Sequence, residues 1–119
     1  MGRFRDRSLL DRVFNFVVEV LKLVEKLPRN RRNMIIEDQL SRAATSTGAN
    51  LEEADGAISR REFVKYVNIS KREMKESNYW LRILRVFEDN LITDIDILLK
   101  ESEELTKIFS SILKKSSEN

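Results

Sequence analysis

Apolar residues near the start of the chain recur at alternating steps of four and three, the spacing of one face of an α-helix. Between residues 8 and 27 this spacing occurs in two neighbouring rows. The first row is Leu10, Phe14, Val17, Leu21 and Val24, and the second is Leu9, Val13, Phe16, Val20, Leu23 and Leu27. Together they are wider than one neighbouring helix can cover. The pattern predicts a helix that lies between two others, or one whose outer row also contacts another subunit.

Residues 29–56 form a second amphipathic segment, which begins after Pro28 because proline disfavours helix at the residue before it and suits the first turn of the next helix. Gly48 in mid-helix costs about 0.8–1.0 kcal/mol relative to alanine. We therefore expect close approach of another helix there, or else a kink, and a left-handed cap at Gly56. The core row is Ile36, Leu40, Ala43, Thr47, Leu51 and Ala54, with the small residues Ala44, Ser46, Gly48, Ala49 and Ala57 around it.

The third segment, residues 60–89, is the longest, at roughly 45 Å of helix. Ser59 and Glu62 match a capping box at its start. Its core row is Phe63, Val67, Ser70, Met74, Ser77, Leu81 and Leu84, flanked by Tyr66, Trp80 and Phe87. A second row with the same spacing lies on the other side and is mostly cationic: Arg61, Lys65, Asn68, Arg72, Lys75, Tyr79 and Arg82, with Arg60, Lys71 and Arg85 beside it.

The fourth segment, residues 94–115, has Thr93 as its expected N-cap. Its apolar row is Ile95, Leu98, Ser102, Leu105, Phe109 and Ile112. Four amphipathic segments with short links predict an all-α fold. Short links also favour antiparallel neighbours. We therefore expect residues 1–119 to form a single domain, an antiparallel up-down-up-down four-helix bundle with helices at 8–27, 29–56, 60–89 and 94–115.

The composition argues against the common catalytic chemistries. The chain has no Cys and no His, so it lacks disulfides, thiolate zinc sites and histidine-based triads. It also lacks a Gly-rich phosphate loop, and we expect neither an enzyme nor a bound cofactor or metal. No run approaches the ~20 apolar residues of a membrane span. No signal peptide is evident at the start of the chain, so an intracellular, cytoplasmic protein is expected.

Polar residues of the second and third segments suggest a buried network. Arg42, Ser46, Asn50 and Glu53 follow one another at steps of four, four and three beside the apolar row. Residues of the third segment that would face them are Ser70, Glu73, Glu76 and Ser77. A satisfied hydrogen-bonded network of this kind fixes the register of two helices. The alternative, a catalytic carboxylate pair of Glu53 and Glu73, has no substrate cleft or oxyanion donor to support it.

Charge is concentrated locally, although the net charge is only +2, from 22 basic and 20 acidic residues. Residues 59–89 hold eight Lys/Arg against five Asp/Glu, and residues 94–119 hold four against six. Cations in a row can contact phosphates, and a tyrosine among them offers a stacking face. The candidate nucleic-acid-binding residues are Arg60, Arg61, Lys65, Arg72, Lys75, Tyr79 and Arg82. The alternative is a solvated or intersubunit face with local salt bridges. Arg29, Arg31 and Arg32 add to this basic surface, form a separate basic patch, or lie in a flexible, solvated turn.

Residues 39–84 also carry three short motifs. They comprise Gln39, Arg42, Ala43, Ala44, Ser46, Asn50, Leu51 and Glu53, then Ser59, Glu62 and Phe63, then Arg72, Glu73, Glu76, Ser77, Tyr79, Trp80 and Leu81. In these motifs the chain resembles the four-helix-bundle family of proteins encoded in intervening sequences of bacterial 23S rRNA genes. Leu51 and Arg72 depart from that family's usual Ile and Lys. Phe4-Arg5-Asp6 and Leu27-Pro28 also fit, so the resemblance covers most of the chain.

This family is similar to the accessory variability proteins of diversity-generating retroelements. The similarity implies a homopentameric ring of four-helix protomers that binds nucleic acid and a reverse transcriptase. Our first hypothesis is accordingly a non-enzymatic, oligomeric bundle that associates with RNA, DNA, ribosomal RNA or a nucleic-acid enzyme. The alternative is a structural or protein-interaction module that binds no nucleic acid, with the double apolar face of residues 8–27 as its interface.

Overall fold

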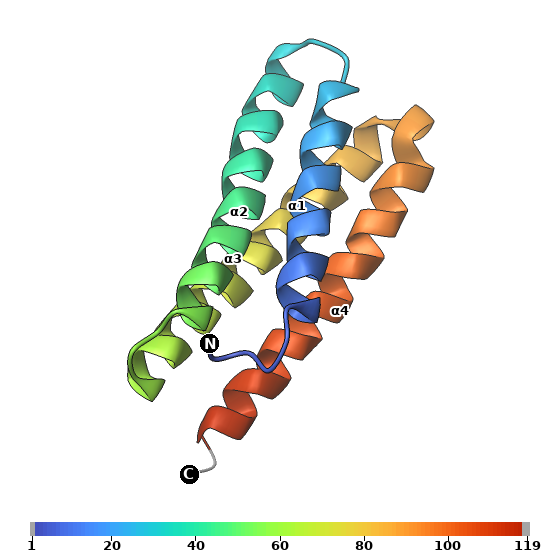
Figure 1. Ribbon diagram of the computed structural model, residues 1–119. Coiled ribbons are helices and arrows are strands. Elements are labelled where there is room, and N and C mark those ends of the chain that lie inside the picture. Colours follow the sequence, from blue (N-terminus) through green and yellow to red (C-terminus); the bar gives the residue numbers. More distant parts are fainter. Residues whose placement is uncertain (1, 118–119) are drawn as a thin grey trace.

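Four α-helices joined by short links make up the computed structural model, which describes residues 2–117 (Figure 1). Helix α1 spans Ser8–Glu25, α2 Arg31–Asp55, α3 Arg60–Phe87 and α4 Ile92–Ser117, with a 3₁₀ turn, η1, at Asp89–Leu91. Residues 2–117 contain no β-strand. No helix in this range is long and apolar enough to span a membrane. The all-helical class predicted from the sequence is confirmed.

Local capping sets the ends of α2 and the start of α3. The Asn30 side chain accepts a hydrogen bond from Asn33 N at 2.8 Å, so α2 begins at Arg31 and not at residue 29. Ser59 caps α3 as the sequence predicts, accepting a bond from Glu62 N at 3.1 Å. The left-handed cap predicted at Gly56 was wrong. Its φ is −89°, because this turn closes through ordinary backbone bonds that need no positive φ.

The start of α4 also differs from the sequence prediction. Thr93 was expected to be the N-cap, but it lies in the first turn of the helix. The cause is η1, in which Leu91 N donates to Glu88 O at 3.0 Å. This turn leads straight into α4, so the helix begins at Ile92 without a side-chain cap from Thr93.

The helices lie side by side in an elongated bundle of 47 × 20 × 19 Å. In Figure 1 the α1–α2 link and η1 lie at the upper end, and the α2–α3 link lies at the lower end. Helix α3 makes its most extensive contacts with α2 and α4. Ion pairs join α1 to α4, from Arg12 to Glu101 at 2.7 Å and from Lys26 to Asp94 at 3.1 Å. The side of α3 that faces away from α2 and α4 is therefore left at the surface.

The hydrophobic core takes residues from all four of these helices. Its most deeply buried side chains are Leu10, Val13, Val20, Leu40, Leu51, Val67, Met74, Leu81, Leu84, Ile95, Leu105 and Phe109. Ser70 and Ser77, predicted as small polar core positions, are also fully buried. Ser70 Oγ donates to Thr47 O at 3.0 Å, and Thr47 Oγ1 donates to Ala43 O at 2.9 Å. These buried hydroxyls are thus satisfied by backbone carbonyls.

Gly48 lies where α2 meets α1. A methyl group at this position would be 3.3 Å from Val17 Cγ2, closer than an ordinary van der Waals contact. Close helix packing, the first of the two explanations predicted for this glycine, is confirmed. The outer apolar row of α1 is only partly covered here, since Phe14 is 63% exposed and Leu21 is 36% exposed.

The segment before α1 crosses the α2–α3 link and is fastened to it. Arg3 N donates to Asp55 O at 2.8 Å, and Phe4 N donates to Asp55 Oδ1 at 2.9 Å. The Phe4 ring packs against Phe63, with the ring centroids 5.5 Å apart. These contacts position the first turn of α3, where the cationic row begins.

Candidate nucleic-acid interface

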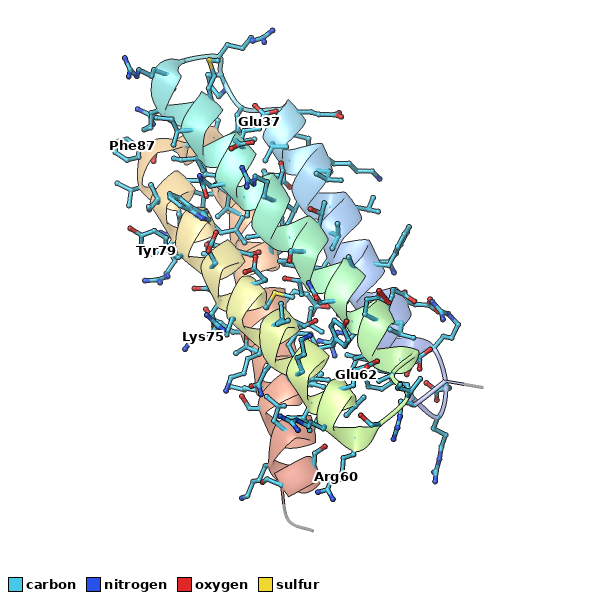
Figure 2. The ribbon with its side chains drawn as sticks, turned by 90° about the vertical axis from the view of Figure 1, so that its left-hand side faces the viewer. Glu37, Arg60, Glu62, Lys75, Tyr79 and Phe87 are labelled. Atoms are coloured by element: carbon cyan, nitrogen blue, oxygen red, sulfur yellow. The ribbon has the colours of Figure 1, made fainter. Side chains whose placement is uncertain are left out.

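The cationic row predicted along the third helix lies on the outer face of α3. Core residues of α3 such as Val67, Met74 and Leu81 are fully buried, and the row lies about half a turn away from them. The seven residues predicted to bind nucleic acid are all exposed: Arg60, Arg61, Lys65, Arg72, Lys75, Tyr79 and Arg82. Figure 2 shows Lys75 and Tyr79 projecting from the bundle, with Arg60 and Phe87 at opposite ends of α3.

Four cations of the row have no ion-pair partner among residues 2–117. Arg61, Lys65, Arg72 and Lys75 take part in none of the salt bridges within 4.0 Å in this range. Arg85, beside the row, does pair with Asp96 at 2.5 Å. Hydrogen bonding across that pair lowers the pKa of Asp96 and raises the pKa of Arg85. The local salt bridges of the alternative prediction therefore do not form at the four row positions.

Two cations of the row contact aromatic rings. The Lys65 ammonium lies 5.1 Å from the centroid of the Tyr66 ring, and the Arg82 guanidinium lies 5.7 Å from that of Tyr79. Arg82 Nε also donates to Asn78 Oδ1 at 2.9 Å. Such contacts orient a cation without neutralising it, so both charges stay available to an anionic partner.

The end of the row nearest η1 is more aromatic than the sequence analysis indicated. The Tyr79 and Trp80 rings meet edge to face with centroids 5.1 Å apart, and Trp80 Nε1 donates to Glu76 Oε2 at 3.3 Å. Trp80 and Phe87 were both placed beside the core row. Trp80 is half-buried, but Phe87 is 52% exposed, as is its neighbour Val86 at 73%.

A buried polar cluster that the sequence analysis missed joins the α1–α2 link to the end of α3. Glu88 Oε2 accepts bonds from Arg32 Nη2 at 3.0 Å and from Asn33 Nδ2 at 3.1 Å. Asn33 Nδ2 also donates to Pro28 O at 2.9 Å. The solvated turn given as one prediction for Arg29, Arg31 and Arg32 is wrong for Arg32, because Glu88 and the Phe87 ring hold its guanidinium.

A signal for this cluster was present in the sequence spacing. Asn33 lies three residues before Ile36, and Glu88 lies four residues after Leu84. Both positions continue the core rows of their helices, and both residues are buried. A buried polar side chain needs a hydrogen-bond partner. The spacing could therefore have predicted that Asn33 and Glu88 each bond to another polar group.

The polar set predicted on α2 bonds mainly within its own helix. Arg42 is exposed and pairs with Asp38 at 3.7 Å. Asn50 Nδ2 donates to Ser46 O at 2.9 Å and to Ser46 Oγ at 3.1 Å. On α3, Ser77 Oγ likewise donates to Glu73 O at 3.0 Å. The hydrogen bond from Ser70 Oγ to Thr47 O does join α3 to α2.

Glu53 and Glu73, the carboxylates of the catalytic alternative, differ in environment. Glu53 is exposed, whereas Glu73 is half-buried. Partial burial, and then the charge of Glu76, raise the pKa of Glu73, while Arg72 lowers it in part. Within residues 2–117 no hydrogen bond joins the two carboxylates of this alternative. The same range contains no group of three or more acidic side chains placed to hold a metal ion.

The fold and this surface define a class: an all-helical bundle protein with a long, exposed cationic face on one helix. The model of the 23S rRNA-intervening sequence protein family matches residues 5–111. The chain therefore belongs to that family, and the resemblance found in its motifs is confirmed at this level.

A solved structure has the same fold. It is a protein with unknown function from the S23 ribosomal protein family of Bacteroides thetaiotaomicron VPI-5482, 31% identical to this chain, with a TM-score of 0.82. The match covers 90% of this chain and 99% of that one. No curated protein matches the chain significantly.

Proposed function

We propose that this protein is a non-enzymatic, oligomeric helical bundle that associates with nucleic acid through the outer face of α3. The observation that carries the proposal is the set of four exposed cations, Arg61, Lys65, Arg72 and Lys75, which have no ion-pair partner within residues 2–117. When the cations of such a row neutralise phosphates, the counterions condensed on the nucleic acid are released, and this release favours binding. The proposed partners are RNA, ribosomal RNA included, and DNA.

The proposal is tested by a salt series with a charge-reversal variant. The triple variant Arg61→Glu/Lys65→Glu/Arg72→Glu removes three phosphate contacts. The slope of log affinity against log salt should then become shallower by about 0.9 per lost contact with duplex, and by about 0.7 with single strands. The matched control, Lys100→Glu/Lys107→Glu/Lys114→Glu, makes the same change of net charge on α4 and should bind as the wild type does. Wild-type protein that retards no nucleic acid in low salt would refute the proposal.

The assembly we propose is an antiparallel, up-down-up-down bundle that forms a homopentameric ring. The alternating positions of the links support the antiparallel path (Figure 1). The outer face of α1 supports association with another copy, because Phe14 and Leu21 leave apolar surface in water. Beside them a groove of about 300 Å³ runs between α1 and α2, lined in part by Val17, Gly48 and Ala49. Similarity to the accessory variability proteins is the basis for the number five.

A second candidate function is that of a protein-interaction module. The same apolar face of α1 favours it, since a reverse transcriptase or another partner protein would cover that surface equally well. We propose action in the cytoplasm in either case. Pull-down of a protein partner that persists after nuclease treatment, and is lost in Phe14→Glu, would favour this candidate over nucleic-acid binding.

A further inference from the structure

The part of the outer α3 face that follows Lys75 is chemically different from the part before it. The preceding part carries the four cations that form no ion pair within residues 2–117, namely Arg61, Lys65, Arg72 and Lys75. In the following part Tyr79 is 48% exposed and Phe87 is 52% exposed. These two residues, called here the stacking pair, lie about 12 Å apart along the helix axis. Tyr79 belongs to the cationic row, whereas Phe87 lies about 80° around the helix from Tyr79, on the side next to Arg32 of α2. A single exposed aromatic residue is ordinary, but two exposed rings beside a cationic row form a patterned surface.

Both rings of the stacking pair are held in place from one side. The Arg32 guanidinium lies 4.2 Å from the Phe87 centroid, and Glu88 fixes that guanidinium at 3.0 Å. Arg82 lies 5.7 Å from the Tyr79 centroid, and the Trp80 ring packs edge to face against Tyr79. Figure 2 shows Tyr79 and Phe87 along the outer edge of α3. The rings are therefore oriented before any partner binds, while about half of each side chain remains in water.

Exposed rings and cations on adjoining strips of one helix suit an unpaired strand better than a duplex. A duplex presents its phosphates outward and keeps the faces of its bases stacked inside, so it can engage the cations alone. A single strand presents phosphates and open base faces together, and every base has a π-face that stacks on an aromatic ring. The distance from Lys75 to Phe87, about 18 Å along the helix, leaves room for several nucleotides between phosphate and stacking contacts.

We infer that the nucleic acid bound by the outer face of α3 is single-stranded, with unpaired bases stacked on Tyr79 and Phe87 and phosphates on the preceding cations. The inference rests on the proposed function, because it assigns the form of nucleic acid that the same surface takes. RNA and DNA share the stacking and phosphate chemistry, so both belong in the test.

The test measures fluorescence anisotropy with labelled oligonucleotides of about 16 nucleotides, the upper end of known single-strand site sizes. RNA and DNA strands are compared with their duplexes in low salt. Tyr79→Leu and Phe87→Leu keep an apolar side chain and lose the aromatic face. Each should weaken single-strand binding by about tenfold or more. Tyr79→Phe should retain it, and duplex binding should change little. Ile97→Ala, at an exposed apolar site on α4, is the control. Thermal unfolding of each variant shows that the fold is intact.

The outcomes separate this inference from the proposed function. Equal affinity for strand and duplex, with charge reversal weakening both and the leucine variants weakening neither, would overturn the inference and leave the proposed function standing. The inference would also be overturned if Tyr79→Leu and Phe87→Leu weakened the binding of single strands and of duplexes equally. Failure of every oligonucleotide to bind would overturn both. If the leucine variants lost a protein partner but bound nucleic acid normally, the stacking pair would be a protein-docking surface, and the inference would be wrong.

Discussion

Replacing Glu88 by alanine tests whether the buried cluster beside the α1–α2 link stabilises the bundle. The Glu88 side chain is only 9% exposed and accepts bonds from Arg32 and Asn33 at 3.0 and 3.1 Å. Asn33 in turn donates to Pro28 O at 2.9 Å. One carboxylate thus connects the end of α3 to the first turn of α2 and to the link before it.

The expected loss follows from the environments of its two donors. Asn33 is 2% exposed, and a buried bond to a charged group contributes about 1.5–3 kcal/mol. Since Asn33 keeps its bond to Pro28, the lower part of that range applies. The Arg32 side chain is 39% exposed and can be hydrated, so its pairing adds only about 0–1 kcal/mol. Glu88→Ala should therefore lower the free energy of unfolding by about 1.5–3 kcal/mol.

Urea unfolding followed by far-UV circular dichroism measures this loss, at one protein concentration for every variant because oligomers are stabilised by mass action. Glu88→Gln keeps an acceptor for Asn33 and should lose only about 1 kcal/mol. Glu103→Ala, at an exposed glutamate of α4, is the matched control. If Glu88→Ala unfolded within about 0.5 kcal/mol of that control, the cluster would contribute nothing measurable, and the reasoning would be refuted.

Three shorter predictions concern other parts of the molecule. Gly48→Ala gains helix propensity but brings a methyl group to 3.3 Å from Val17, so it should stabilise the protein by at most about 1 kcal/mol. Gly48→Leu should destabilise the protein. Denaturant unfolding of both variants measures the difference. Phe14→Glu should convert the proposed oligomer to monomer with unchanged helix content, as light scattering and circular dichroism would show. A monomeric wild type at micromolar concentration would contradict the proposed ring. The pKa of Glu73 is raised above 4.5 by burial, so its charge destabilises the folded state at neutral pH. Glu73→Gln should raise the unfolding midpoint near pH 7, and this gain should vanish as pH falls below about 4.

Helix existence could be predicted from spacing, whereas the helix ends could not be predicted fully. The four apolar rows lie in the four helices because a run of period 3.6 can bury a face only as a helix. The failures at Gly56 and Thr93 arose because each residue suits a cap, while backbone bonds of the neighbouring turn decided where the chain leaves the helix. Local sequence does not show which of several adequate caps a turn will use.

The candidate site was predictable to the extent that it lies on one helix. Arg61, Lys65, Arg72 and Lys75 share a face because of helical geometry alone, and their exposure follows from the burial of the opposite row. Arg32 beside Phe87 was not predictable in this way, because these residues are far apart in sequence and meet only when α2 packs against α3.

By itself the sequence determined the all-helical class, the core face of each helix, the cationic row on the third helix and the presence of either close packing or a kink at Gly48. These features depend on the period of one segment at a time. The tertiary structure decided that Glu88 is buried with Arg32 and Asn33 and that the Tyr79 and Phe87 rings are oriented at the surface. It also decided that Arg61, Lys65, Arg72 and Lys75 form no ion pair within residues 2–117. Those features depend on which helices become neighbours, because hydrogen bonds and ring contacts act only over a few ångströms.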